Sequence, residues 1–217
     1  MLFRSVPKWH PEFDQFQPFP VHVWIVRHPM GAVLVDTGIG LGNELINEWY
    51  RPQVTLLPAA LETVGLTTTD ITILVLTHLH FDHCGQHAAV AAPVYVQRLE
   101  YELAKTSGYT VPEWAAIPET RLRLVDGELE VLPGIRLLPT PGHTPGHQSV
   151  IVETGDGRVA LGGQCAYRAA ELLSGEARPA NLHGPEWQAT ATDSLARIRA
   201  LAPVTVHLSH DAEVVSL

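Results

Sequence analysis

The sequence predicts an α+β fold in which two β-sheets pack face to face and helices cover the outer faces. Short β-branched and aliphatic runs form two groups, one in each half of the chain, and helical segments follow each group. Histidine clusters follow several of these runs, so they are expected at the ends of strands. We expect one domain over residues 1–217, because 217 residues with 46% apolar content can bury a substantial core.

The first half is predicted to begin with a hairpin and to centre on one buried strand. Residues 21–27 and 32–35 flank a Pro29-Met30-Gly31 turn, and residues 56–64 are predicted to be helical. Residues 71–76 form an unbroken apolar run, which is typical of a strand buried on both faces. The later elements are a short helix at 86–91, a strand at 94–96, a helix at 98–105 and an exposed Pro/Gly/Ser/Thr-rich flap at 106–120.

The second half is predicted to contain the other sheet and the clearest helix. An Asp156-Gly157 turn indicates a hairpin, and residues 187–201 place Leu195, Ile198 and Leu201 on one helical stripe. The expected strands are 122–125, 129–132, 135–138, 149–153, 159–161 and 204–208.

The stretch Thr77-His78-Leu79-His80-Phe81-Asp82-His83-Cys84-Gly85 is the strongest functional signal. It places three imidazoles and a carboxylate within six residues, directly after the predicted strand at 71–76. Imidazole and carboxylate together suit zinc or a similar borderline divalent metal. A histidine-rich solvated loop would need neither the aspartate at this spacing nor the glycine that follows, so a metal site is predicted.

Composition argues against several classes of partner. The chain carries 14 basic and 23 acidic residues, a formal charge of −9, and no run of Lys or Arg that would attract nucleic acid or an anionic membrane. No stretch reaches the roughly 20 apolar residues of a membrane span or carries the core of a signal peptide, so a cytoplasmic protein is expected. Cys84 and Cys165 are interpreted as small buried side chains rather than ligands.

Four segments together resemble the metallo-β-lactamase superfamily, in order and over nearly the whole chain. They are Asp36-Thr37-Gly38, the His78–His83 motif, Pro141-Gly142-His143-Thr144-Pro145-Gly146-His147 and Ser209-His210-Asp211. The segment Gly163-Gln164-Cys165-Ala166-Tyr167 and the Ser-His-Asp ending are most similar to the N-acyl-homoserine lactonase branch. The resemblance implies a four-layer αββα sandwich, the metallo-β-lactamase fold, with its site at one edge.

The resemblance also implies a set of ligands. His78, His80 and His143 would hold a first metal, and Asp82, His83 and His210 a second. Asp36 would support the metal loop, and His147 would stack behind the site rather than ligate. His207 lies three residues before His210 and competes with it for the ligand role, but His210 is preferred because it lies just past the strand end.

The position of the family's bridging aspartate is occupied here by Gln164. An amide offers one neutral oxygen where a carboxylate offers negative charge and two oxygens, so the second metal should bind more weakly. Three arrangements remain open. The site is dinuclear with the Gln164 carbonyl as a ligand, it holds one metal tightly, or Cys165 or Asp211 moves in to compensate.

The function that the resemblance implies is hydrolysis of a lactone, of the N-acyl-homoserine type, or of a related small ester. A zinc ion, one or two per chain, lowers the pKa of a bound water to about 7 and thereby supplies the attacking hydroxide at neutral pH. Asp82 is expected to pass a proton to the leaving alkoxide, and Tyr167 to donate a hydrogen bond to the substrate carbonyl.

An N-terminal arm at 1–20 is dense in aromatic residues. Phe16 and the neighbouring aromatic residues of this arm either pack as part of the core or form an apolar lip for an acyl chain. In the second case the flap around Trp114 would belong to the lip, and the lip would be shared with the neighbouring subunit of a homodimer. The substrate-binding residues expected are Tyr167, Phe16 and Trp114.

Two other functions remain open. One is a different ester or thioester hydrolase of this fold, although the few lysines disfavour a glutathione thioester. The other is a non-catalytic metal- or ligand-binding protein whose second metal site is impaired by Gln164.

Overall fold

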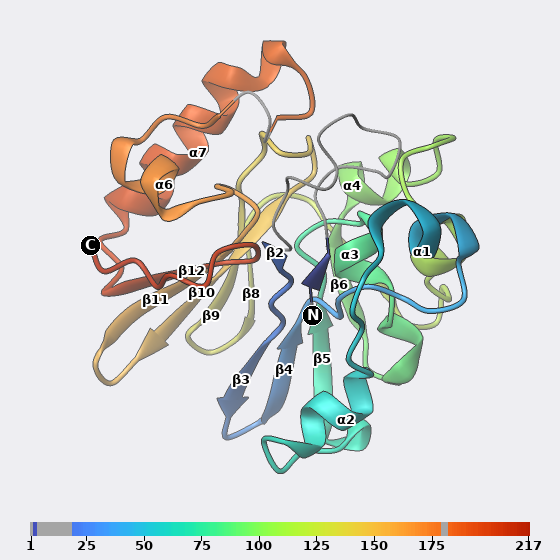
Figure 1. Ribbon diagram of the computed structural model, residues 1–217. Helices are drawn as coiled ribbons and strands as arrows, with labels where there is room; N and C mark the ends of the chain where they lie inside the picture. The colour runs from blue at the N-terminus through green and yellow to red at the C-terminus, as the bar shows by residue number, and fades with distance from the viewer. Residues whose placement is uncertain (1, 4–18, 179–181) are drawn as a thin grey trace.

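A computed structural model describes residues 2–3, 19–178 and 182–217 of the chain. Two five-stranded sheets face each other, with helices outside both, so the chain is layered as helices, sheet, sheet and helices (Figure 1). This is the metallo-β-lactamase fold, and the predicted αββα sandwich is confirmed.

The first sheet has the strand order β3-β4-β5-β6-β7. Strands β3 and β4 form the predicted antiparallel hairpin, and β4, β5, β6 and β7 run parallel to one another. The strand bounds are β3 (Trp24–His28), β4 (Gly31–Val35), β5 (Ile71–Val75), β6 (Val94–Gln97) and β7 (Leu122–Val125).

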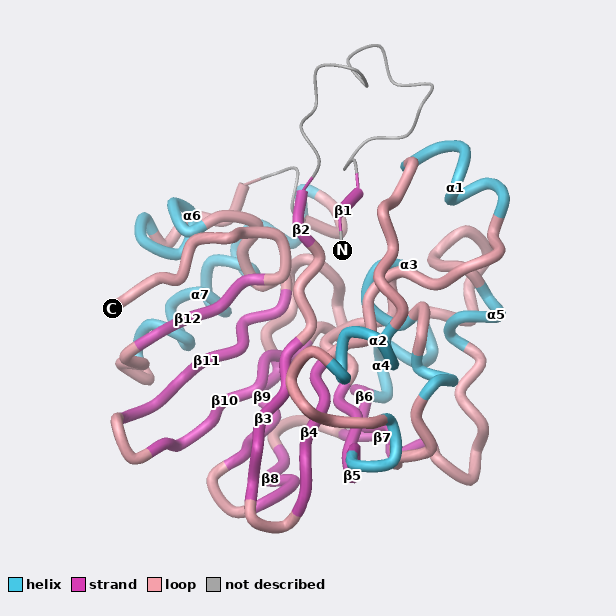
Figure 2. Tube along the Cα trace, turned by 60° about the horizontal axis from the view of Figure 1, so that its bottom comes forward, coloured by secondary structure: helices cyan, strands magenta, loops and turns pink. Residues whose placement is uncertain are grey.

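The second sheet has the order β12-β11-β10-β9-β8. Its strands are antiparallel to their neighbours except β12, which pairs parallel to β11. The bounds are β8 (Leu129–Leu132), β9 (Ile135–Pro139), β10 (Gln148–Thr154), β11 (Gly157–Gly163) and β12 (Thr205–Leu208). A two-stranded ribbon of β1 (Leu2–Phe3) and β2 (Phe19–Pro20) lies above the two sheets (Figure 2).

The helices divide between the two outer faces (Figure 1). Those beside the first sheet are α1 (Glu44–Tyr50), α2 (Leu57–Glu62), α3 (Phe81–Cys84), α4 (Arg98–Leu103) and α5 (Pro112–Ala115). Those beside the second are α6 (Ala169–Ser174) and α7 (Gln188–Ala200). Short 3-10 turns occur at Thr68–Asp70, His87–Ala89 and Pro185–Trp187.

Alternation along β4 shows how the layers are held together. Val33 and Val35 point into the cluster between the two sheets, whereas Ala32 and Leu34 point into the cluster under α2. Both faces of the strand are therefore buried, because successive side chains of a strand point to opposite faces. A third cluster joins the second sheet to α6 and α7, and it contains Leu195 and Ile198 of the predicted helical stripe.

One prediction about the first half of the chain is wrong in part. The sequence predicts an exposed flap over 106–120, but this segment contains α5, and Val111, Ala115 and Ile117 are buried. Residues 106–108, 112, 113, 116 and 118–120 are exposed as expected. The apolar residues are too widely spaced among Pro, Gly and Thr to give a periodic signal. Ala115 and Ile117 are buried by the cluster on the first sheet, and Val111 by the cluster that contains Ile39 of the loop after β4 and Ile46 of α1.

Four short helices, α1, α3, α5 and α6, were not predicted. Helix α1 begins after Asn43, whose side chain accepts a hydrogen bond from the Ile46 N–H and so caps the helix. The expected N-terminal arm lies mostly outside the described residues, and Phe16 is among those not described. None of the helices in the described ranges is long and apolar enough to cross a bilayer.

Candidate metal centre

Loops from both sheets meet at one edge of the sandwich, the upper edge in Figure 1. His78 and His80 follow β5, and His143 lies in the loop between β9 and β10. Gln164 follows β11 and His210 follows β12. Segments that are distant in sequence therefore supply one site, because these strands end at the same edge.

The first group of donors is made of three imidazoles. Ring nitrogens of His78, His80 and His143 all lie within 4.8 Å of one another. His80 Nδ1 lies 3.0 Å from His143 Nε2, and the buried His78 Nε2 has no hydrogen-bond partner in the described part of the chain. A cation would satisfy these three converging ring nitrogens better than hydrogen bonds among them can.

The second group contains one carboxylate and two imidazoles. Donor atoms of Asp82, His83 and His210 lie within 4.8 Å of one another, and all three residues are buried. Asp82 Oδ2 is 3.6 Å from His83 Nε2 and 3.4 Å from His210 Nε2. The structure thus brings together the six residues that the resemblance pairs as two sets of three.

Asp36 holds the second group from behind. Its Oδ2 is 2.8 Å from His83 Nδ1, its Oδ1 accepts the Thr77 N–H at 2.7 Å, and the Thr77 hydroxyl donates to Oδ2 at 2.8 Å. A carboxylate on Nδ1 leaves the His83 Nε2 free to face Asp82, the usual arrangement behind a metal-bound histidine. This contact supports the structural role expected of Asp36.

His210 is oriented in the same way by the main chain. Its Nδ1 donates to the Pro20 carbonyl oxygen at 2.9 Å, so the neutral ring directs the Nε2 lone pair toward Asp82 and toward Gln164 Oε1, which is 3.1 Å away. The His210 Nε2 lone pair, the Asp82 carboxylate and the Gln164 carbonyl oxygen face a common point, where a cation could bind all three. The amide oxygen is therefore placed where a carbonyl ligand is needed.

His147 stands behind the site. Its ring lies 5.4 Å from that of His78, its Nδ1 is 2.9 Å from the Thr140 hydroxyl, and its Nε2 accepts the Gln164 N–H at 2.9 Å. Both nitrogens are engaged by protein groups, so the ring is not available as a ligand. His207 is not among the residues that face the site, since it lines a cavity in another part of the molecule.

The protonation states of four of the five candidate histidine ligands favour metal binding. Burial and the neighbouring histidines lower the pKa of His78 and His143 well below the ordinary value, and burial lowers the pKa of His80 to about 4 and of His210 to about 3. Burial also opposes protonation of His83, but the carboxylates of Asp82 and Asp36 outweigh it, and the His83 pKa is raised. The four imidazoles with a lowered pKa are neutral and can ligate zinc directly, whereas a metal at His83 must displace the proton that the two carboxylates stabilise there.

Gly85 ends the motif for a steric reason. A Cβ atom at this position would lie 2.0 Å from the Gly40 nitrogen, and the Gly85 N–H donates to the Gly38 carbonyl at 2.9 Å. The loop after β4 and the end of α3 can therefore approach only if this residue is glycine.

The structure does not support Asp211 or Cys165 as a replacement for the bridging carboxylate that Gln164 lacks. Asp211 accepts the Ala169 N–H at 2.8 Å and lies 3.7 Å from Arg168, so its carboxylate is engaged at the start of α6. Cys165 is buried, and burial raises the pKa of its thiol to about 12. Cys84 is likewise fully buried, as expected for a small packed side chain.

Two of the expected substrate contacts are described. The Tyr167 ring lies 4.9 Å from the His210 ring, beside the second group of donors. Trp114 instead packs between two hydrophobic clusters and against Gly40, and it does not line the cavity next to His80. Its position does not support a direct substrate contact.

A cavity of about 510 Å³ opens beside His80. Its walls come from α1, α3 and the segment 108–112, and they are largely apolar or aromatic. The lining residues are Asn43, Leu45, Ile46, Trp49, Tyr50, His80, Phe81, Gly108, Tyr109, Thr110, Val111 and Pro112. This apolar pocket was not predicted from the sequence, because α1 was not.

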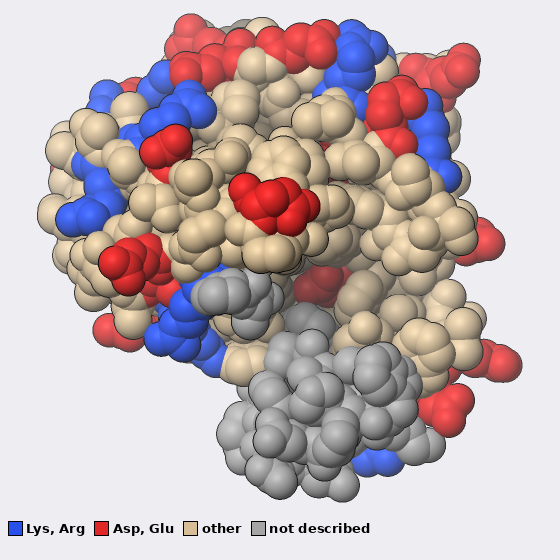
Figure 3. Space-filling view, turned by 90° about the horizontal axis from the view of Figure 1, so that it is seen from above, with Lys and Arg blue, Asp and Glu red and all other residues tan. Residues whose placement is uncertain are grey.

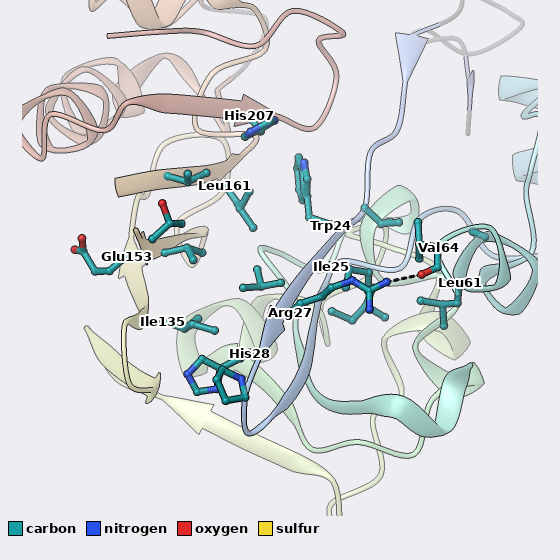
Figure 4. Close-up of a pocket in the computed structure, with 18 of the residues that line it drawn as sticks. Trp24, Ile25, Arg27, His28, Leu61, Val64, Ile135, Glu153, Leu161 and His207 are labelled. Carbon is teal, nitrogen blue, oxygen red and sulfur yellow. Dashed lines mark hydrogen bonds between the residues drawn. The ribbon is translucent and has the colours of Figure 1, made fainter. Parts of the chain in front are cut away.

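A larger hollow of about 860 Å³ lies elsewhere, along the free edge of β3 (Figure 4). Trp24 and Leu161 approach it from the two sheets, and Arg27 on its rim donates a hydrogen bond to the Val64 carbonyl. None of the six candidate ligands lines it. Cavity size alone would therefore indicate the wrong location.

The face that carries the site has both acidic and basic side chains. Seen from above, acidic and basic side chains lie around its rim, and an acidic group stands near the centre among mostly uncharged residues (Figure 3). The described part of this face has no broad basic patch of the kind that binds nucleic acid.

Comparison with known sequences agrees with this geometry. The chain matches the Metallo-beta-lactamase superfamily over residues 16–210. It is 36% identical over 148 residues to an N-acyl homoserine lactonase of a Bacillus species, a match covering 62% of this chain and 59% of the relative. A probable metallo-hydrolase of Mycobacterium tuberculosis is 27% identical over 230 residues, covering 89% of this chain and 72% of that protein.

Comparison with solved structures also finds N-acyl homoserine lactone hydrolases. An N-acyl homoserine lactone hydrolase with the product N-hexanoyl-L-homoserine bound at its catalytic metal centre superposes with a TM-score of 0.80 and 29% identity. That match covers 91% of this chain and 83% of the other. A quorum-quenching N-acyl homoserine lactone hydrolase superposes with a TM-score of 0.78 and 30% identity, over 91% of this chain and 82% of the other.

Proposed function

Because the chain belongs to the metallo-β-lactamase superfamily, we propose that it is a metal-dependent hydrolase that opens a lactone of the N-acyl-homoserine type. The observation that carries this proposal is the pair of three-donor groups beside a largely apolar cavity. His78, His80 and His143 hold one metal, and Asp82, His83 and His210 hold the other with the Gln164 carbonyl. Zinc is the metal that this donor set favours.

The metals, when bound, supply a nucleophile at neutral pH and polarise the substrate carbonyl. The chain's own residues then place the substrate and move a proton. Asp82 is buried next to both His83 and His210, where it carries a proton to the leaving alkoxide. Tyr167 donates a hydrogen bond to the carbonyl oxygen from its place beside His210.

The cavity beside His80 accounts for the acyl part of the substrate. Its aromatic and aliphatic walls, among them Trp49, Phe81 and Val111, offer a chain of methylene groups a dry surface. Each buried methylene contributes about 0.8 kcal/mol, so a longer acyl chain should bind more tightly until the cavity is filled.

The direct test is hydrolysis of N-hexanoyl-homoserine lactone by the whole chain, with ring opening followed as acid release at constant pH. We expect activity that a chelator removes and added zinc restores. Butanoyl, hexanoyl and decanoyl substrates should show a rising specificity constant. A zinc-loaded protein that opens none of these lactones would contradict the proposal, and a flat series would contradict the role of the cavity.

Replacing Tyr167 with phenylalanine should lower the turnover number about a hundredfold and leave the metal content unchanged, because one hydrogen bond to the transition state is lost. Steady-state kinetics together with metal analysis would measure both quantities. Tyr95, on a strand away from the site, offers a matched Tyr→Phe control. A wild-type turnover number in Tyr167→Phe would remove this side chain from the mechanism.

Two other functions differ from this proposal in measurable ways. Another ester or thioester hydrolase of the same fold would use the same metals but prefer acyclic substrates in the panel. A non-catalytic binding protein would take up metal and hydrolyse nothing. We further propose a single-domain cytoplasmic protein, as a monomer or homodimer, without nucleic-acid or membrane partners.

A further inference from the structure

Glu100, in α4, is a fully buried carboxylate outside the two groups of donors. Its Oε1 accepts the Leu79 N–H at 2.8 Å and the Tyr109 hydroxyl, and its Oε2 accepts the Thr144 hydroxyl at 2.7 Å. The Gly146 N–H donates to the same carboxylate. Among the described residues, no Lys or Arg forms an ion pair with it.

The donors belong to three segments that meet at the first metal group. Leu79 lies between His78 and His80, and Thr144 directly follows His143. The Tyr109 ring lies 5.0 Å from the His80 ring and lines the cavity of about 510 Å³. One carboxylate therefore ties both histidine loops to the wall of the pocket.

Close packing leaves this arrangement little freedom. A Cβ atom at Gly146 would lie 2.3 Å from the Glu100 nitrogen, so the His143 loop rests directly on α4. A buried carboxylate is unfavourable by several kcal/mol unless hydrogen bonds satisfy it. Here all the donors that satisfy it come from the site and its pocket, so the hydrogen bonds to this carboxylate hold these segments in place.

We propose that Glu100 is a positioning residue that holds His80 and His143 in metal-binding geometry before the metal arrives. The 3.0 Å approach of His80 Nδ1 to His143 Nε2 is then a property of the protein rather than of the bound ion. Metal affinity at the three-histidine group depends on this preorganisation. The inference rests on the metal centre of the proposed function but not on the identity of its substrate.

Glu100→Gln is the sharpest variant, because it keeps the shape and changes the acceptors. If the new NH₂ takes the place of Oε1, the Leu79 N–H loses its acceptor. If it takes the place of Oε2, the Thr144 hydroxyl must turn from donor to acceptor. Either choice loosens one histidine loop.

The experiment measures zinc affinity by competition with a chromogenic chelator. It also records the visible absorption spectrum of the cobalt-substituted protein, which reports the geometry of the metal ligands. We expect Glu100→Gln to weaken the tighter metal site about tenfold and to change the cobalt spectrum. Glu102→Gln is the matched control, since this exposed glutamate lies on the same helix and pairs with the exposed Lys105. It should leave both readouts unchanged.

Tyr109→Phe and Thr144→Val each remove one donor and keep the carboxylate, so they guard against a Glu100→Gln protein that fails to fold. Both should weaken zinc binding by a smaller factor than Glu100→Gln. Unchanged affinity and an unchanged cobalt spectrum in folded Glu100→Gln, or in both hydroxyl variants, would overturn the proposal. None of these readouts requires lactone hydrolysis, so the inference and the proposed function can fail separately.

Discussion

Replacing Gln164 with aspartate should tighten the binding of the second divalent metal by about two powers of ten. In the wild-type chain the two groups of donors contain only one carboxylate, that of Asp82, and five imidazoles. At an effective dielectric of about 20, a unit charge about 4 Å from another contributes roughly 4 kcal/mol, of which desolvation cancels part. The Gln164 amide already lies 3.1 Å from His210 Nε2, so the new charge would be near the second metal.

Zinc titration calorimetry on protein stripped of metal would measure both affinities. The matched control is Gln164→Asn, which has the shorter side chain of aspartate but no charge, and it should not tighten the site. Equal second-site affinity in the wild type and in Gln164→Asp would show that an amide serves as well as a carboxylate here.

This expectation has a consequence for the wild-type protein. The three-histidine group should fill first, and the second metal should exchange more readily. Metal analysis of protein purified without chelator or affinity tag would then give a value between one and two equivalents that rises with added zinc. Two equivalents that survive dialysis against a weak chelator would contradict weak binding at the second site.

Replacing Asp36 with asparagine should weaken the second metal about 10- to 100-fold. The carbonyl of the substituted amide must accept the Thr77 N–H, which leaves its NH₂ facing His83 Nδ1. His83 then accepts at Nδ1 and carries its proton on Nε2, the nitrogen that faces Asp82. The backbone should tolerate the change, because Asp36 has a φ of 59° and asparagine adopts this region readily.

Nitrogen-15 chemical shifts of the His83 ring would report the tautomer, and zinc titration would report the affinity. Asp126→Asn is a suitable control, since this exposed aspartate pairs with the exposed Arg98 and forms no hydrogen bond with a candidate ligand among the described residues. A tautomer that changes without loss of metal affinity would separate the orientation of His83 from metal binding. An unchanged tautomer would contradict the hydrogen-bond assignment.

Much of this fold could be predicted from local patterns. The hairpin around Pro29-Met30-Gly31, the buried strand before the histidine motif and the stripe on α7 all follow from short-range periodicity. These patterns are reliable because each element buries a face that its own sequence defines. The prediction for segment 106–120 was wrong where burial depends on what packs over the segment rather than on its own period.

The chemistry available to this protein can be read from its motifs, since the six donor residues and the glutamine stand in recognisable patterns. How these residues are used depends on the folded arrangement. Glu100 in a helix of mixed polarity gives no sequence signal, and its role depends on donors 9 to 46 residues away along the chain. Likewise, His210 is oriented by the Pro20 carbonyl, 190 residues earlier. Hydrogen bonds between distant segments form only after the two sheets pack, so no local pattern can contain them.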